Sequence, residues 1–197
     1  MSRLRDKKCE KGFTVVELLI IAAFIGVLLA IAIPNLFKAR IASNEAGARK
    51  ALQVLRDAEA QYFEQDLNDD GIRNYTANIP ASNESLRCPK STGTCTEYDA
   101  LIDSTFEDAV ASGATAQCND SKSGYCIKFA GDIDGTDPLV LQSEYGWEAS
   151  TIAVRRTGIK DFAVYEDGVI KCTASLEETG EEGRFQANRA TSVACDN

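Results

Sequence analysis

The most pronounced pattern in the sequence is an apolar run near the N-terminus. Residues 13–33 contain a single charged side chain, that of Glu17. As an α-helix rising about 1.5 Å per residue, this run would be about 31 Å long, close to the thickness of the hydrocarbon core of a bilayer. It therefore predicts a helix that spans a membrane. Pro34 lacks an amide hydrogen, so we expect a helix kink there, with Gly26 as a second weak point.

After Pro34 the pattern changes to a single apolar face. Apolar side chains recur at steps of three and four residues, which is the spacing of one face of an α-helix. These residues are Ala48, Ala51, Leu52, Leu55, Ala58 and Tyr62. We expect this amphipathic helix to end near Gln65 and to pack its apolar face on a sheet.

The later part of the chain predicts short strands. Residues 75–120 are rich in Thr, Ser and Asn, which indicates a loop-rich connector with a short helix around residues 96–110. Beyond it, strands are predicted over residues 125–129, 139–141, 151–154, 161–165 and 169–172, with a hairpin turn at residues 166–168. The expected fold class is α+β: a long N-terminal helix, with a transmembrane half and an amphipathic half, packed on a small antiparallel β-sheet head.

Charge is divided unevenly along the chain. Residues 1–12 carry a net charge of +3, which leaves −12 for residues 13–197 of a chain whose total is −9. A basic segment ahead of a membrane helix stays on the cytoplasmic side, which places the residues after the helix outside. An acidic body cannot neutralise phosphates, so no nucleic-acid partner is expected.

The composition also argues against an enzyme. The chain has no histidine, the commonest general base and the usual zinc ligand. Phosphate-loop, nucleophile-elbow and Ser-x-x-Lys motifs are missing from the sequence. We therefore expect no catalytic residues and no cofactor apart from the calcium considered below.

Six of the seven cysteines lie beyond the apolar run, whereas Cys9 precedes it. An even number in an exported domain predicts three disulfides formed in an oxidising compartment. A metal site is disfavoured because no pair has CxxC spacing. Six cysteines allow fifteen pairings, of which we expect the one between nearest neighbours. These pairs are Cys88 with Cys95, Cys118 with Cys126, and Cys172 with Cys195.

The junction before the apolar run carries a specific motif. Residues 11–19, KGFTVVELL, resemble the type IV prepilin processing motif, with glycine before the cut, phenylalanine after it and glutamate at the fifth mature position. The resemblance to type IV pilin-like proteins, which include type IV pilins and type II secretion pseudopilins, covers residues 11 to about 65. It implies that a prepilin peptidase cuts between Gly12 and Phe13 and methylates the new amino terminus of Phe13.

The resemblance also implies a domain order. It consists of a cleaved cytoplasmic leader at residues 1–12, a transmembrane or filament-core helix at 13–34, an amphipathic helix at 35–65 and a disulfide-stabilised head at 66–197.

Glu17 is the unusual residue of the apolar run. A carboxylate within bilayer hydrocarbon costs on the order of 2.5 kcal/mol or more, so it is usually functional. Cleavage would create a positive α-amine at Phe13, one helical turn away. We hypothesise that Glu17 pairs with the amine of a neighbouring subunit and sets its axial register. The alternatives are pairing with the amine of its own chain and simple tolerance near the membrane interface.

The function implied by the resemblance is that of a structural subunit, major or minor, of a type IV pilus. Its partners would be copies of itself or other pilins, the prepilin peptidase and an inner-membrane assembly platform. The precursor would sit in the inner membrane with its head in the periplasm, and the mature chain would join an extracellular pilus. The alternatives are a periplasmic type II secretion pseudopilin and a minor pilin that acts as an adhesin.

An ordinary signal peptide is a different interpretation of the same apolar run. Residues 30–32, Ala-Ile-Ala, match a small-x-small cleavage pattern. Pro34 close behind the supposed cut and Glu17 near the start of the run argue against it. A plain membrane anchor is a further alternative.

Two clusters of oxygen-bearing side chains are candidate calcium ligands. Asp66, Asn68 and Asp70, followed by Gly71, match the opening of an EF-hand loop. The twelfth position of that loop is Ala77, where an EF-hand has a bidentate glutamate. The second cluster is Asp132, Asp134 and Asp137. Asp and Gly are also common in turns, which is the alternative for both clusters.

Overall fold

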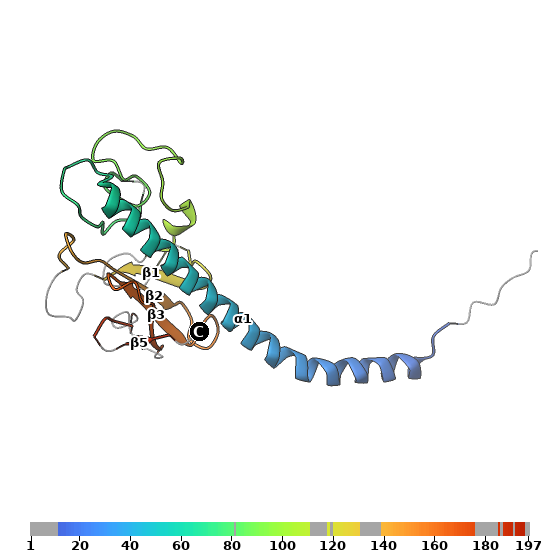
Figure 1. Cartoon of the computed structure of the whole chain (residues 1–197). Coiled ribbons are helices and arrows are strands. Elements are labelled where there is room, and N and C mark those ends of the chain that lie inside the picture. Colours follow the sequence, from blue (N-terminus) through green and yellow to red (C-terminus); the bar gives the residue numbers. More distant parts are fainter. Residues whose placement is uncertain are drawn as a thin grey trace, which may run out of the picture. The chain divides into compact units, whose positions relative to one another are not determined.

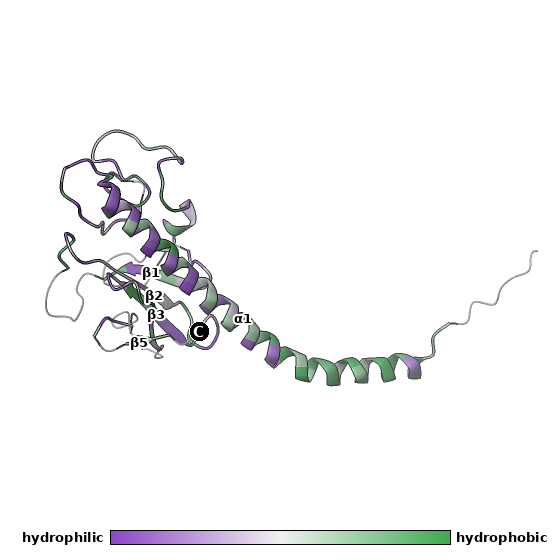
Figure 2. Ribbon diagram, viewed as in Figure 1, coloured by the Kyte–Doolittle hydropathy of each residue, from purple (hydrophilic) through white to green (hydrophobic). Residues whose placement is uncertain are grey.

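A computed structural model describes residues 12–80, 82–110, 118, 120–130, 139–175, 185, 187–190 and 192–195 (Figure 1). The chain divides into two units, Met1–Ala39 and Arg40–Asn197. The main helix, α1, extends over Val15–Gln65 and ends at the predicted residue. Figure 2 shows that its first half is almost uniformly apolar, whereas its second half alternates between polar and apolar residues.

The second unit contains an antiparallel sheet of five strands. The strands are β1 (Tyr125–Phe129), β2 (Gly146–Thr151), β3 (Lys160–Tyr165), β4 (Lys171–Ala174) and β5 (Val193–Ala194). They are arranged in sequence order, so each pairs with the next along the chain. The predicted α+β class, a long helix with a small antiparallel sheet, is confirmed.

The main core lies between the second half of α1 and one face of this sheet. All six residues of the predicted apolar stripe of the helix are buried. They share one cluster with Ile127, Trp147, Ala149, Phe162 and Val164 from strands β1, β2 and β3. Leu52 and Leu55 are completely buried, and burying such side chains contributes about 1.5–3 kcal/mol each.

The opposite face of the sheet is covered as well. Ala163 and Tyr165 alternate with Phe162 and Val164 along β3 and belong to a second, smaller cluster with Ala130 and Ala187. The hydroxyl of Tyr165 donates to Glu148 Oε1 at 3.0 Å. Because both faces are covered, every residue of β2 is buried, including its polar ones.

A buried carboxyl group, that of Glu59, lies within the main core. Glu59 is on α1 and is fully buried. Its Oε1 accepts a hydrogen bond of 2.8 Å from Trp147 Nε1 on β2, and its Oε2 accepts one of 3.1 Å from the backbone N–H of Thr76. Burial raises the pKa of Glu59 to about 8, while the two hydrogen bonds act in the opposite direction. Glu59 thus ties α1 both to the sheet and to the segment that follows the helix.

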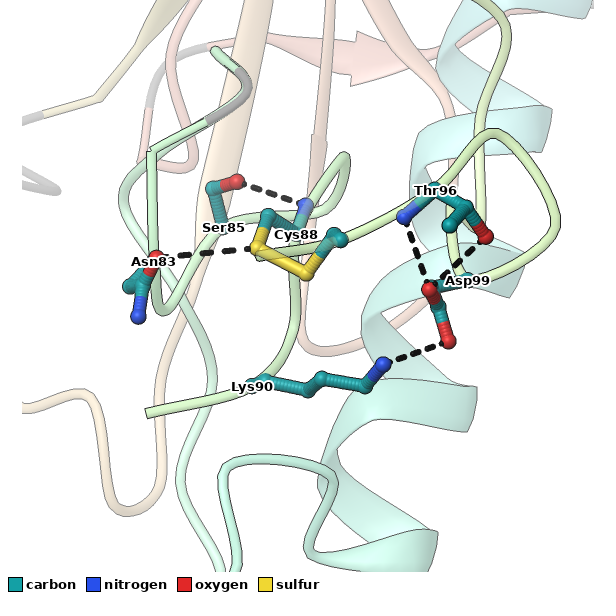
Figure 3. Close-up of a disulfide and its surroundings, with 7 residues drawn as sticks. Asn83, Ser85, Cys88, Lys90, Thr96 and Asp99 are labelled. Carbon is teal, nitrogen blue, oxygen red and sulfur yellow. Dashed lines mark hydrogen bonds and ion pairs between the residues drawn. A yellow bond between two sulfur atoms is a disulfide. The ribbon is translucent and has the colours of Figure 1, made fainter. Parts of the chain in front are cut away.

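The connector between α1 and the sheet is held by ionic and covalent links. Arg87 is largely buried, and its guanidinium binds Glu97 through two bonds of 2.7 and 2.9 Å and Glu107 through one of 2.8 Å. Figure 3 shows the nearby Cys88–Cys95 disulfide, beside which the Cys88 N–H donates to Ser85 Oγ at 2.9 Å.

Asp99 fixes the end of the same loop (Figure 3). It forms an ion pair of 2.8 Å with Lys90 and accepts a hydrogen bond of 2.8 Å from the N–H of Thr96. These partners, Lys90 foremost, lower the pKa of Asp99 to about 2. The carboxylate therefore stays charged throughout the ordinary pH range.

Several predicted elements differ from the structure. The helix expected around residues 96–110 is only a 3-10 turn, η1 (Ser104–Phe106), because the connector is held by Arg87 and the disulfide instead. Residues 139–141 form no strand; they lead into a turn, and Leu141 O accepts a hydrogen bond from the Tyr75 N–H instead of from a sheet neighbour.

The strand boundaries also need correction. The strand predicted at 151–154 is wrong: it shares only Thr151 with β2, which ends there because Ala153 and Thr157 close a turn directly after it. The strand predicted at 169–172 begins two residues later, at Lys171. The hairpin turn at residues 166–168 is present, with Gly168 at a φ of +68°, a conformation that glycine adopts without strain.

Glu59 makes the stability of the head depend on pH. Its pKa of about 8 in the folded chain lies above the ordinary value of 4.5, so the folded state keeps a proton that the unfolded state releases. The free energy of unfolding should therefore fall as the pH rises from about 4.5 to about 8, by up to about 5 kcal/mol. Urea unfolding followed by the fluorescence of Trp147, the single tryptophan, measures this fall.

The same experiment contains its own control. The chain has no histidine, so no side chain with an ordinary pKa titrates between about pH 5 and 8. Glu59→Gln cannot titrate, and the free energy of unfolding of this variant should be constant over that interval. A wild-type chain whose stability is constant or rises between these pH values would contradict the assignment.

Candidate functional site

The candidate site is the N-terminal end of α1. Gly12, Phe13 and Thr14 precede the helix, which begins at Val15. The N–H and the hydroxyl of Thr14 each donate to Glu17 Oε2 at 2.8 Å, and the Glu17 N–H donates to Thr14 Oγ1 at 3.2 Å. This reciprocal arrangement is a capping box, which satisfies backbone donors that an α-helix leaves free at its start.

The capping box was not among the sequence-based predictions. Its signature is present in the sequence, because Thr14 and Glu17 follow the pattern of Ser or Thr with Glu three residues later, ahead of an apolar run. Glu17 thus has a structural role within its own chain. That role is separate from any contact with a neighbouring subunit.

The first half of α1 presents apolar side chains to its surroundings on all sides. Val15, Phe24 and Leu28 are 73%, 69% and 66% exposed, and the most apolar 18-residue window of the helix has no buried residue. The helix is long and apolar enough to cross a membrane. A helix that is apolar all round needs an apolar environment on every side.

The predicted cleavage point, leader and helix kink belong to the same region. Apart from Gly12 and its two chain neighbours, nothing lies within 4 Å of the position that a Cβ on Gly12 would occupy, and Phe13 is exposed, so among the described residues nothing covers the predicted cleavage point. Residues 1–11 of the predicted leader lie outside the described residues. Pro34 and Gly26 both lie inside α1, and the predicted kink stays a prediction.

The cysteines are paired between nearest neighbours, as expected. Cys88 and Cys95 have Cα atoms 5.3 Å apart, Cys118 and Cys126 5.8 Å, and Cys172 and Cys195 5.4 Å. The first bridge closes the connector, the second holds residue 118 against β1, and the third joins β4 to the residue after β5.

Of the two candidate calcium clusters, one lies among the described residues. Asp132, Asp134 and Asp137 lie outside the described residues. Asp66, Asn68 and Asp70 form the loop directly after α1, with Asn68 buried. Within the described part of the chain, no three Asp, Glu, Cys or His side chains gather in a way that could hold a metal ion. The loop therefore offers two carboxylates together with amide and backbone oxygens.

Known proteins similar to this chain include a pilin and a competence protein. The chain is 29% identical to the type IV major pilin protein PilA of Myxococcus xanthus (strain DK1622) over 156 residues, an alignment that covers 75% of this chain and 66% of that protein. It is also 29% identical over 120 residues to the competence protein ComGC of two strains of Streptococcus pneumoniae, covering 61% of this chain and 97% of that protein.

These relatives support the type IV pilin-like family predicted from the sequence. No family model matches it, and no solved structure matches it. The chain spans just under two thirds of the length of the Myxococcus pilin. The long apolar helix and the small antiparallel sheet agree with the family predicted from residues 11–65. Cleavage at Gly12 and methylation of Phe13 stay predictions.

Proposed function

We propose that this chain is a structural subunit of a type IV pilus. The observation that carries the proposal is the exposed apolar first half of α1. The second unit already has a core of its own, in which Leu52 and Leu55 are completely buried. An exposed apolar surface as long as residues 13–33 marks a place that lipid or another protein covers.

One helix can meet both kinds of environment in succession. Before assembly, residues 13–33 would span the inner membrane, with the basic residues 1–12 in the cytoplasm and the head in the periplasm. In the filament, the same residues would pack against their counterparts in other subunits. A helix that is apolar all round suits this second role, because neighbours can contact it from several directions.

One observation favours a pilus over a periplasmic pseudopilus. The alignment with a type IV major pilin covers 75% of this chain, and the alignment with a competence protein covers 61%. The three disulfides suit a head in either place, because the periplasm and the cell surface are both oxidising. A type II secretion pseudopilin and a minor pilin with an adhesive head are the alternative roles.

The proposed processing gives a direct test. Filaments are sheared from the cells that make this protein, and the chain is recovered from both the sheared fraction and the cell envelope. Mass spectrometry should find a chain beginning at N-methylated Phe13 in the sheared fraction. A chain that begins at Ile33 would mean cleavage by a signal peptidase, and an intact Met1 would mean a plain anchor. Either result would overturn the proposal, whereas N-methylated Phe13 in the envelope alone would indicate a pseudopilus.

We further propose that Glu17 pairs with the α-amine of Phe13 in a neighbouring subunit. Both capping bonds from Thr14 end on Oε2 of Glu17, so among the described residues its other oxygen is free of hydrogen bonds. A carboxylate and an amine that leave water together attract strongly, whereas either one alone is costly. The pair would therefore favour one axial position of each incoming subunit.

Three variants separate this charge from the helix cap. Glu17→Gln keeps a capping box but removes the charge, Glu17→Ala removes both, and Thr14→Ala removes the cap while leaving the charge. The measured quantity is the ratio of subunit in sheared filaments to subunit in the envelope, with cleavage checked by mass spectrometry. We expect this ratio to fall at least about tenfold in both Glu17 variants, which corresponds to about 1.4 kcal/mol.

Thr14→Ala is the matched control and should enter filaments nearly as well as the wild-type chain. If Glu17→Gln were cleaved normally and assembled at the wild-type level, the pairing would be wrong. The role of Glu17 would then be the helix cap alone.

A further inference from the structure

We propose that the loop of residues 66–74, directly after α1, binds a calcium ion. This loop plays no part in the filament proposal, and the inference stands whichever filament the chain joins. Its sequence, DLNDDGIRN, matches the first nine positions of an EF-hand loop. In that pattern, oxygens at positions one, three, five, seven and nine bind the ion, and glycine at position six allows the sharp turn. The five ligand positions are Asp66, Asn68, Asp70, Ile72 and Asn74, and the glycine is Gly71.

The backbone of the loop turns these side chains toward one another. The Gly71 N–H donates to Asp66 Oδ2 at 3.1 Å, and the Ile72 N–H donates to Asp70 Oδ1 at 2.7 Å. Gly71 has a φ of +78°, which glycine adopts without strain. The carboxylates of positions one and five therefore belong to one closed turn. Such bonds also occur in turns that bind no ion, so they describe the shape of the loop only.

The evidence for a ligand comes from Asn68. Its side chain is only 3% exposed, and its Nδ2 lies 2.9 Å from Asp70 Oδ2 and 3.5 Å from Asn74 Oδ1. The amide group is therefore inside the loop, between positions five and nine. Its Oδ1 is buried without a hydrogen-bond partner, and so is Oδ1 of Asp66. A buried acceptor without a donor costs about 1–3 kcal/mol.

The unsatisfied Oδ1 of Asp66 at position one and the buried amide of Asn68 at position three fit a cation site. Carboxylate and amide oxygens are the ligands that Ca²⁺ takes, and an ion satisfies them without any donor hydrogen. The oxygen and nitrogen of an asparagine amide exchange places when the group rotates by half a turn. Such a rotation would exchange the two atoms: Oδ1 of Asn68 would lie beside the oxygens of Asp70 and Asn74, a group of three oxygens that a cation would satisfy, and Nδ2 would take the place where Oδ1 now has no partner.

The charges around the loop favour a cation as well. Among the described residues, none of Asp66, Asp69 and Asp70 forms an ion pair with a lysine or arginine. The hydroxyl of Tyr62 lies within range of electrostatic interaction with Asp66 and Asp70. Burial, and then the negative charges of Glu84, Glu59, Asp70 and Asp66, raise the pKa of Tyr62 to about 12.

The expected affinity is modest. Position twelve is Ala77, so the bidentate glutamate of a complete EF-hand is missing and only two of the side-chain ligands are charged. Calcium sites of extracellular modules bind with dissociation constants of about 10⁻⁴–10⁻³ M, and we expect this range. Binding would brace the segment that carries the Thr76 N–H to Glu59. Calcium should therefore also raise the melting temperature.

The test uses the full mature chain in detergent micelles, stripped of metal with EDTA and titrated with CaCl₂ in a calorimeter. The test variant is Asp66→Asn combined with Asp70→Asn. The matched control is Asp69→Asn, which removes one negative charge from position four, a position that supplies no ligand in the pattern. Wild-type chain and control should bind alike, and the double variant should bind at least about tenfold more weakly. Calcium should raise the melting temperature of the first two only.

A second variant keeps the test informative if the double variant fails to fold. Asn68→Asp adds a charge at position three without removing a ligand, and it should bind calcium more tightly than the wild-type chain because affinity rises with ligand charge. A wild-type chain that shows no calcium binding would overturn the proposal. A double variant that folds and binds as the wild-type chain does would overturn it too, and would direct attention to Asp132, Asp134 and Asp137.

Discussion

The packing of α1 against the sheet is the interaction on which the rest of the second unit depends. Leu52, Leu55 and Tyr62 from the helix meet Trp147, Phe162 and Val164 from the strands in one buried cluster. The same helix continues toward the N-terminus as a segment whose side chains are apolar on every side. A single element thus has to satisfy a protein core in one half and lipid or other helices in the other. The helix is therefore apolar on every side in its first half and on only one face in its second half.

Glu59 adds specificity to this packing. Apolar side chains alone would let a helix slide on a sheet at little cost, whereas a buried carboxyl must meet its hydrogen-bond partners to avoid a large desolvation penalty. Trp147 Nε1 and the Thr76 N–H are these partners. They fix the helix to β2 and to the segment after the helix at once. The loop of residues 66–74 lies between Glu59 and Thr76 in the sequence, so its conformation influences how the helix end is held.

The sequence predicted the elements that follow simple periodicity. The apolar run, the buried stripe from Ala48 to Tyr62 and the helix end at Gln65 all depend on local patterns, and the structure has them. Glu59 was missed because a charged residue on the buried stripe is explained only by Trp147, which is 88 residues away. Strand β2 was placed wrongly because Gly146, Glu148 and Ser150 have little strand character of their own, and both faces of the sheet are covered by parts of the chain that are distant in sequence. The two-residue strand β5 gives too little pattern to detect.

The central claim is that residues 13–33 are covered by other subunits in a filament. Cryo-electron microscopy of filaments sheared from the cells that make this protein tests it most directly. The account predicts a map in which these residues from neighbouring copies form a continuous apolar interior, with side-chain atoms within about 4.5 Å of one another and the heads outside. A map in which residues 13–33 face solvent, or sheared filaments that do not contain this chain, would contradict it.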